Sequence, residues 1–112
     1  MKRIASEFPE VIKRLGALAF DNKLFPGEAI IFTTQKGYTL VALVNHINPA
    51  RKIMDDNETV LYLTQTAIED MVRELGEDRH FVSFILGRRY NAWCEIVSTI
   101  KKMDLSWSVY RD

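Results

Sequence analysis

The hydrophobic period of the chain changes near residue 28, and this change constrains the fold more than any other feature. Upstream of it, apolar residues recur at steps of three and four, which is the period of an amphipathic helix. Pro9 suits the first turn of such a helix because its missing N–H group would have no partner there, and Ser6 is the predicted N-cap. We therefore predict a helix over about residues 7–20. Its apolar positions are Phe8, Val11, Ile12, Leu15, Leu18 and Ala19.

Downstream of residue 28 the chain is rich in β-branched and aromatic residues, which favour strands. Two such runs, residues 29–34 and 38–44, are separated by the short segment 35–37, and this arrangement predicts a β-hairpin. A long polar connection over residues 45–57 follows. Residues 58–63 are then predicted to form a third strand.

A second helix is predicted to begin at Thr66, because Thr66 and Glu69 have the spacing of a capping box. Gly76 is its predicted end, since glycine readily adopts the positive φ angle found at helix C-termini. The apolar face of this helix consists of Ile68, Met71, Val72 and Leu75.

The last third of the chain is predicted to add a strand, a helix and a final strand. Residues 80–86 fit both a helical face and a doubly buried strand, and we predict the strand. Residues 89–103 carry a wide apolar stripe at helical spacing, and residues 105–110 alternate large apolar with small polar side chains. The fold class expected for residues 1–112 is therefore a single α+β domain of order αβββαβαβ, with a mostly antiparallel sheet packed by helices.

Length and cysteine content indicate where such a chain would work. Its 112 residues are typical of one domain. Cys94 is the sole cysteine, so an intrachain disulfide is excluded and the reducing cytoplasm is the expected location. No export signal is readable after Met1, and the longest aliphatic run, residues 40–44, is far below the roughly 20 residues that cross a bilayer. No membrane association is expected.

Catalytic residues are not apparent. A thiolate nucleophile needs a nearby base, and the only candidates are Cys94 with His46 or His80. Cys94 follows Trp93 within a predicted helix, a setting typical of a small buried hydrophobe. We assign no catalytic residue and do not expect an enzyme.

Metal and cofactor sites are not expected either. The two histidines lie far apart in the sequence and have no ligand spacing. Residues 55–58 resemble a calcium loop but lack its glycine and its distant bidentate glutamate. The five glycines are isolated, so no phosphate-binding loop is present.

Charge is balanced over the whole chain but unevenly distributed along it. Fifteen basic residues match fifteen acidic ones, yet residues 55–78 carry eight acidic side chains against Arg73, a net charge of −7. The acidic side chains of the predicted second helix are expected to face a basic partner protein and to speed its encounter. The alternative is an ordinary solvated helix face. The residues of this acidic face are Glu69, Asp70, Glu74 and Glu77.

These observations favour a small cytoplasmic protein-binding module that inhibits or regulates a partner protein by masking its surface. Immunity proteins, antitoxins and phage-encoded inhibitors of defence systems are small domains without catalytic motifs that work in this way. The prediction rests on that class of protein and on no resemblance to a family. Exposed sheet edges and a C-terminal strand with Trp107 and Tyr110 also indicate a homodimer.

A nucleic-acid-binding accessory protein is the alternative. Two guanidinium groups beside an aromatic ring, at a predicted strand-to-helix junction, are able to hold phosphates or to stack on bases. The residues of this basic and aromatic patch are Arg88, Arg89 and Tyr90, extended by Arg51 and Lys52.

Overall fold

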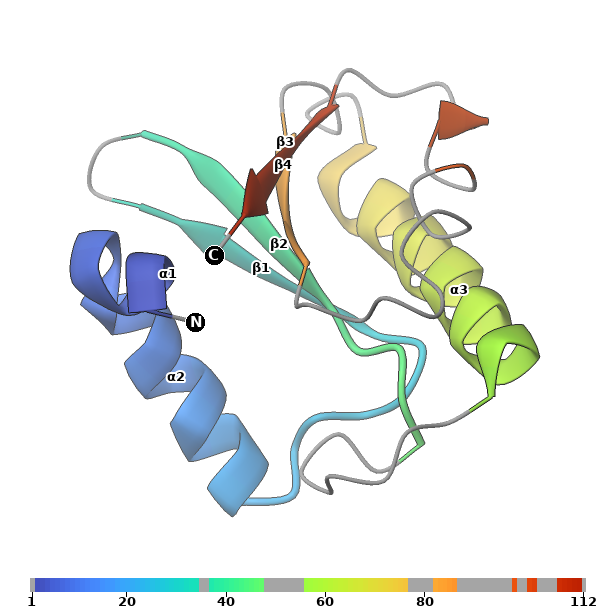
Figure 1. The fold of residues 1–112 in the computed structure, drawn as a ribbon, viewed down its shortest axis with the longest axis horizontal. Helices are drawn as coiled ribbons and strands as arrows, with labels where there is room; N and C mark the ends of the chain where they lie inside the picture. The colour runs from blue at the N-terminus through green and yellow to red at the C-terminus, as the bar shows by residue number, and fades with distance from the viewer. Residues whose placement is uncertain are drawn as a thin grey trace.

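The computed structural model describes residues 2–34, 37–47, 56–76, 82–86, 98, 101–102 and 107–111 (Figure 1). Helices and one β-sheet make up this part of the chain, which confirms the predicted α+β class. In chain order the elements are α1 (Lys2–Glu7), α2 (Pro9–Phe20), β1 (Ala29–Thr33), β2 (Thr39–Leu43), α3 (Asn57–Leu75), β3 (Val82–Leu86) and β4 (Trp107–Arg111).

The sheet has the strand order β1-β2-β3-β4 and is mixed. Strands β1 and β2 form the predicted antiparallel hairpin, with Ile31 opposite Val41. Strand β3 pairs parallel to β2, with Phe84 opposite Val41, and β4 pairs parallel to β3, with Val109 opposite Phe84. The expectation of a mostly antiparallel sheet is therefore wrong, because two of the three pairings between described strands are parallel.

Strands β2 and β3 are parallel because a helix, and not the predicted third strand, connects them. Residues 58–63 belong to α3, whose N-cap is Asp56, ten residues before the predicted N-cap Thr66. The Asp56 carboxylate accepts a hydrogen bond from the Thr59 N–H at 2.8 Å. Parallel neighbours need a crossover connection, and α3 lies on the connection between β2 and β3. The predicted order αβββαβαβ is wrong at this element.

Thr66 lies inside α3 and does not begin a helix. Its hydroxyl donates to the Tyr62 carbonyl at 2.9 Å, the bond that a threonine makes back to the preceding turn. The predicted end of the helix is confirmed, since Gly76 is the C-cap with a φ angle of +56°.

The N-terminal helix differs from the prediction at its start. Ser6 lies within the short helix α1, and Phe8 occupies the position before α2 without a side-chain cap. Phe8 is buried, and its ring packs edge-on against the Tyr38 ring with centroids 6.3 Å apart. Core packing of an aromatic ring therefore takes the place of a capping hydrogen bond, while Pro9 sits in the first turn as predicted.

Helices cover both faces of the hairpin, α2 on one side and α3 on the other (Figure 1). Successive side chains of a strand point to opposite faces, so β1 and β2 each contribute to two hydrophobic clusters. The cluster under α3 contains Ala29, Val41, Val60, Ile68, Met71, Val82 and Phe84. The cluster under α2 contains Phe8, Val11, Ile30, Phe32, Leu40 and Val44.

The remaining predictions concern the C-terminal third. The strand predicted over residues 80–86 is confirmed as β3, and the last strand is confirmed as β4. The helix predicted over residues 89–103 lies outside the described residues, except Ser98 and Lys101, which are helical, and Lys102. Among the helices that the structure describes, none combines the length and the apolar character needed to cross a membrane.

Candidate functional site

Helix α3 carries the residues of the predicted acidic face, and the structure separates them by environment. Glu69 and Glu74 are exposed, whereas Asp70 is half-buried. Glu77 lies outside the described residues. The helix therefore presents two of the predicted carboxylates to solvent and turns a third toward the sheet.

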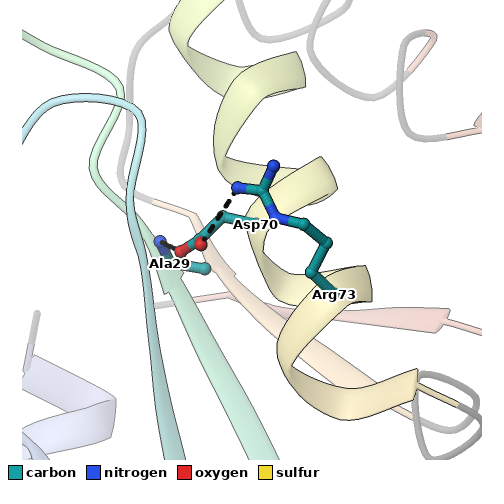
Figure 2. A network of polar contacts seen from close by, with 3 residues as sticks. All are labelled: Ala29, Asp70 and Arg73. Atoms are coloured by element: carbon teal, nitrogen blue, oxygen red, sulfur yellow. Dashed lines mark hydrogen bonds and ion pairs between the residues drawn. The ribbon is translucent and has the colours of Figure 1, made fainter.

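Asp70 ties α3 to the start of β1, as Figure 2 shows. Its Oδ2 atom accepts a hydrogen bond from the Ala29 N–H at 3.0 Å. Its Oδ1 atom lies 3.4 Å from the Arg73 guanidinium, one turn along the helix. The Arg73 side chain is 74% exposed, so this ion pair contributes little to stability. The main role of Asp70 is to satisfy a backbone N–H group of β1.

Glu28, immediately before β1, lies beside α3 and belongs to the same surface. Burial raises the pKa of its carboxyl above the usual value of 4.5, and the neighbouring carboxylates of Asp70 and Glu74 raise it further. We call Glu28, Asp70 and Glu74 the acidic group. The sequence did not point to Glu28, because its proximity to the other two depends on how α3 packs against β1.

The solvent side of α3 continues this surface along the helix. Tyr62, Gln65, Glu69 and Arg73 are all exposed and follow one another at steps of three or four residues. This spacing places them on one side of the helix, and we call them the outer stripe. Tyr62 is 69% exposed, a large apolar surface among charged and polar neighbours. The outer stripe and the acidic group together form the candidate site.

The predicted basic and aromatic patch lies outside the part of the chain that the structure describes, so the nucleic-acid alternative stays a prediction. The residues concerned are Arg51, Lys52, Arg88, Arg89 and Tyr90.

The cysteine-based alternative is equally untested. His46 is half-buried just beyond β2, whereas Cys94 and His80 lie outside the described residues. Within the described ranges, no three His, Cys, Asp or Glu side chains are grouped closely enough to hold a metal ion.

Comparisons of the chain with protein-family models, with curated proteins and with solved structures return no match. The function of the candidate site therefore has to be argued from its own chemistry.

Proposed function

We propose that the chain is a protein-binding module that regulates or inhibits a partner protein by covering a basic surface with helix α3. The observation that carries this proposal is the exposure of an aromatic side chain and two carboxylates on one helix. Tyr62, Glu69 and Glu74 are the exposed members.

The charge of this surface selects the partner. Arg73 is the one cation in the outer stripe and the acidic group, and the 3.4 Å contact directs it to Asp70. Glu28, Glu69 and Glu74 are left without a comparable partner among these residues. A surface of this kind attracts basic partners and repels acidic ones, and it accelerates diffusional encounter at low ionic strength.

Tyr62 adds an apolar contact to the electrostatic attraction of the carboxylates. Aromatic side chains are enriched among the few interface residues that carry most of a binding free energy, because they bury a large area with few rotatable bonds. The side chain of Tyr62 precedes Glu69 by two helical turns on the same side of α3. A partner with an apolar pocket beside basic side chains is complementary to this pair.

The opposite side of α3 keeps this surface rigid. Val60, Ile68 and Met71 are each at most 2% exposed and anchor the helix to the sheet. A helix of 19 residues is about 28 Å long, enough to cover a substantial part of a partner's active or binding surface. Because the helix is already ordered, binding loses little conformational entropy, and masking requires no chemistry from this chain.

The proposal is tested by affinity purification of the chain from nuclease-treated lysate of its source cells. The wild-type chain is expected to recover one stoichiometric basic partner, and the double variant Glu69→Gln, Glu74→Gln is expected to lose most of it. Tyr62→Ala is expected to weaken recovery at least about tenfold, as interface aromatic anchors do.

Matched controls lie on α2 and at its C-cap, across the sheet from α3. Glu10→Gln with Asp21→Asn makes the same change of charge, and Phe20→Ala removes an aromatic ring that is 88% exposed. Both control variants are expected to recover the partner as the wild type does. A partner lost equally from the α2 and α3 variants, or recovery of nucleic acid alone when nuclease is omitted, counts against the proposal.

A further inference from the structure

Among the strands that the structure describes, β1 lies at an edge of the sheet. It pairs with β2 on one side and is the terminal strand in the order β1-β2-β3-β4. The Val44 N–H donates to the Glu28 carbonyl and the Thr34 N–H to the Tyr38 carbonyl, each at 2.9 Å. In an antiparallel ladder alternate residues bond to the neighbour, so the backbone groups of residues 29, 31 and 33 point away from β2.

Asp70 forms a hydrogen bond with the first of these outward groups, the Ala29 N–H. Its bond to the Ala29 N–H confirms that this group points away from β2. Within the described part of the chain, nothing hydrogen-bonds to the outward groups of Ile31 and Thr33. The Thr33 side chain is exposed and that of Ile31 is half-buried. Protected edges usually carry a charge, a proline or a bulge, and the Ala29–Thr33 sequence contains no charge and no proline.

We propose that this edge pairs antiparallel with β1 of a second copy of the chain, which joins two sheets across a two-fold axis. The face of β1 toward α2 is already covered, since Ile30 and Phe32 are buried at 7% and 6% exposure. The groups left to bind a partner are the outward N–H and C=O groups of Ile31 and Thr33. The edge of another β-strand carries matching acceptors and donors. An antiparallel pair of identical strands satisfies itself, because each copy supplies the donors that the other accepts.

The Asp70 contact selects the register of this pairing. With Ala29 already bonded, the open positions are Ile31 and Thr33, so Ile31 of one copy lies opposite Thr33 of the other. Each such pair exchanges two hydrogen bonds, which gives about four across the axis. Phe32 then lies directly opposite Phe32 of the second copy. A register with Ile31 opposite Ile31 would place Ala29 opposite Thr33. The Ala29 N–H would then have to give up its hydrogen bond to Asp70.

Electrostatics favours the antiparallel arrangement over a parallel one. The acidic group lies at the start of β1. Glu28 directly precedes Ala29, and the Asp70 carboxylate accepts a hydrogen bond from the Ala29 N–H. In the proposed register the two Ala29 residues are six positions apart, roughly 20 Å along the strands. That separation exceeds the Debye length of about 8 Å at physiological salt, so the two acidic groups hardly repel each other. Parallel pairing would bring them together.

The first test is the molar mass of the full chain in solution, measured by light scattering over a range of concentrations. A dimer is expected to form as concentration rises. Thr33→Pro removes the outward N–H without removing a bond to β2, and it is expected to raise the dissociation constant at least about tenfold. Thr33→Lys places a charge at the edge and is expected to act in the same direction.

The control is Gln65→Lys, which adds the same charge on the outer stripe and is expected to leave the dimer unchanged. Circular dichroism identifies variants that keep the fold. A chain that stays monomeric at every concentration, or a dimer unaffected by both Thr33 variants, overturns the proposal.

The second test addresses the register. In a Cys94→Ser background, chains with Ile31→Cys are mixed with chains with Thr33→Cys and oxidised. Directly opposed residues have Cα atoms about 5.5 Å apart, within disulfide range, so the mixed disulfide dimer is expected. Cross-linking of Ile31→Cys chains to each other in preference to the mixed pair overturns the proposed register.

Discussion

Asp70 has a structural role that its place in an acidic segment conceals. The sequence assigns it to a binding surface together with Glu69 and Glu74, but its carboxylate accepts the Ala29 N–H at 3.0 Å. Periodicity places a side chain on a helix face, yet it does not show which backbone group of another element lies within reach. At the scale of the residue, the candidate site therefore includes one carboxylate that holds the fold.

Removal of the Asp70 carboxylate is predicted to destabilise the protein. Asp70→Ala leaves the Ala29 N–H without its acceptor, and the free energy of unfolding is expected to fall by about 1–2 kcal/mol. Urea denaturation measures the change. Glu74→Ala, which removes an exposed carboxylate from the same helix, is expected to change stability by less than about 0.5 kcal/mol. Equal effects of the two substitutions would contradict the structural role of Asp70.

Glu28 predicts a dependence of stability on pH. Burial and the charges of Asp70 and Glu74 raise its pKa above 4.5, so the folded state binds its proton more tightly than the unfolded state does. The contribution of Glu28 is therefore most favourable below pH 4.5 and is lost as pH rises through the folded pKa. Glu28→Gln is expected to be more stable than the wild type at neutral pH, and the difference is expected to disappear below pH 4.5. Urea midpoints across this pH range measure it, and a variant less stable at pH 7 would contradict it.

Among the elements, the hairpin was predictable and the first part of α3 was not. Residues 29–34 and 38–44 are apolar and β-branched, and local strand preference agrees with their tertiary position. Residues 58–63 have a similar preference for strands, but α3 buries Val60, Thr64 and Met71 at the spacing of a helix. Packing against the sheet outweighs local preference there. Asp56 followed by Glu58 was the available signal, because both residue types favour helix N-termini.

The cap at Asp56 predicts a second dependence on pH. The hydrogen bond from the Thr59 N–H lowers the Asp56 pKa below 3.8, so the cap contributes stability above that pH and loses it as pH falls through the folded pKa. Asp56→Ala is expected to lower the urea midpoint at pH 7, and Asp56→Ser, which keeps a capping oxygen, is expected to lower it less. The gap between wild type and Asp56→Ala should narrow below pH 3.8. A gap that does not depend on pH would show that another contact is responsible.

At the scale of the whole molecule, one sheet joins two hydrophobic clusters. Leu40 and Val41 are adjacent in β2, yet the first packs under α2 and the second under α3. The alternation of strand side chains made this division predictable. The parallel pairing of β2 with β3 was not, because it depends on the crossover through α3. The same placement of α3 explains why the sequence did not reveal Glu28 as part of the candidate site.

Both clusters are predicted to support a single unfolding transition. Leu40→Ala and Met71→Ala each remove a side chain of at most 1% exposure, one from each cluster. Each substitution is expected to lower the free energy of unfolding by about 2–5 kcal/mol. Because the sheet is shared, far-UV circular dichroism and tryptophan fluorescence are expected to report coincident transitions. Separate transitions in either variant would contradict the coupling of the two clusters.

The proposal that α3 docks on a basic partner is tested most directly by the association rate with the recovered partner at several salt concentrations. For the wild-type chain, the rate is expected to fall steeply as salt increases, because the carboxylates steer the encounter. For the variant Glu69→Gln, Glu74→Gln, the rate is expected to be lower at low salt and less dependent on salt, while Glu10→Gln with Asp21→Asn follows the wild type. Equal salt dependence in all three proteins would contradict the assignment of binding to α3.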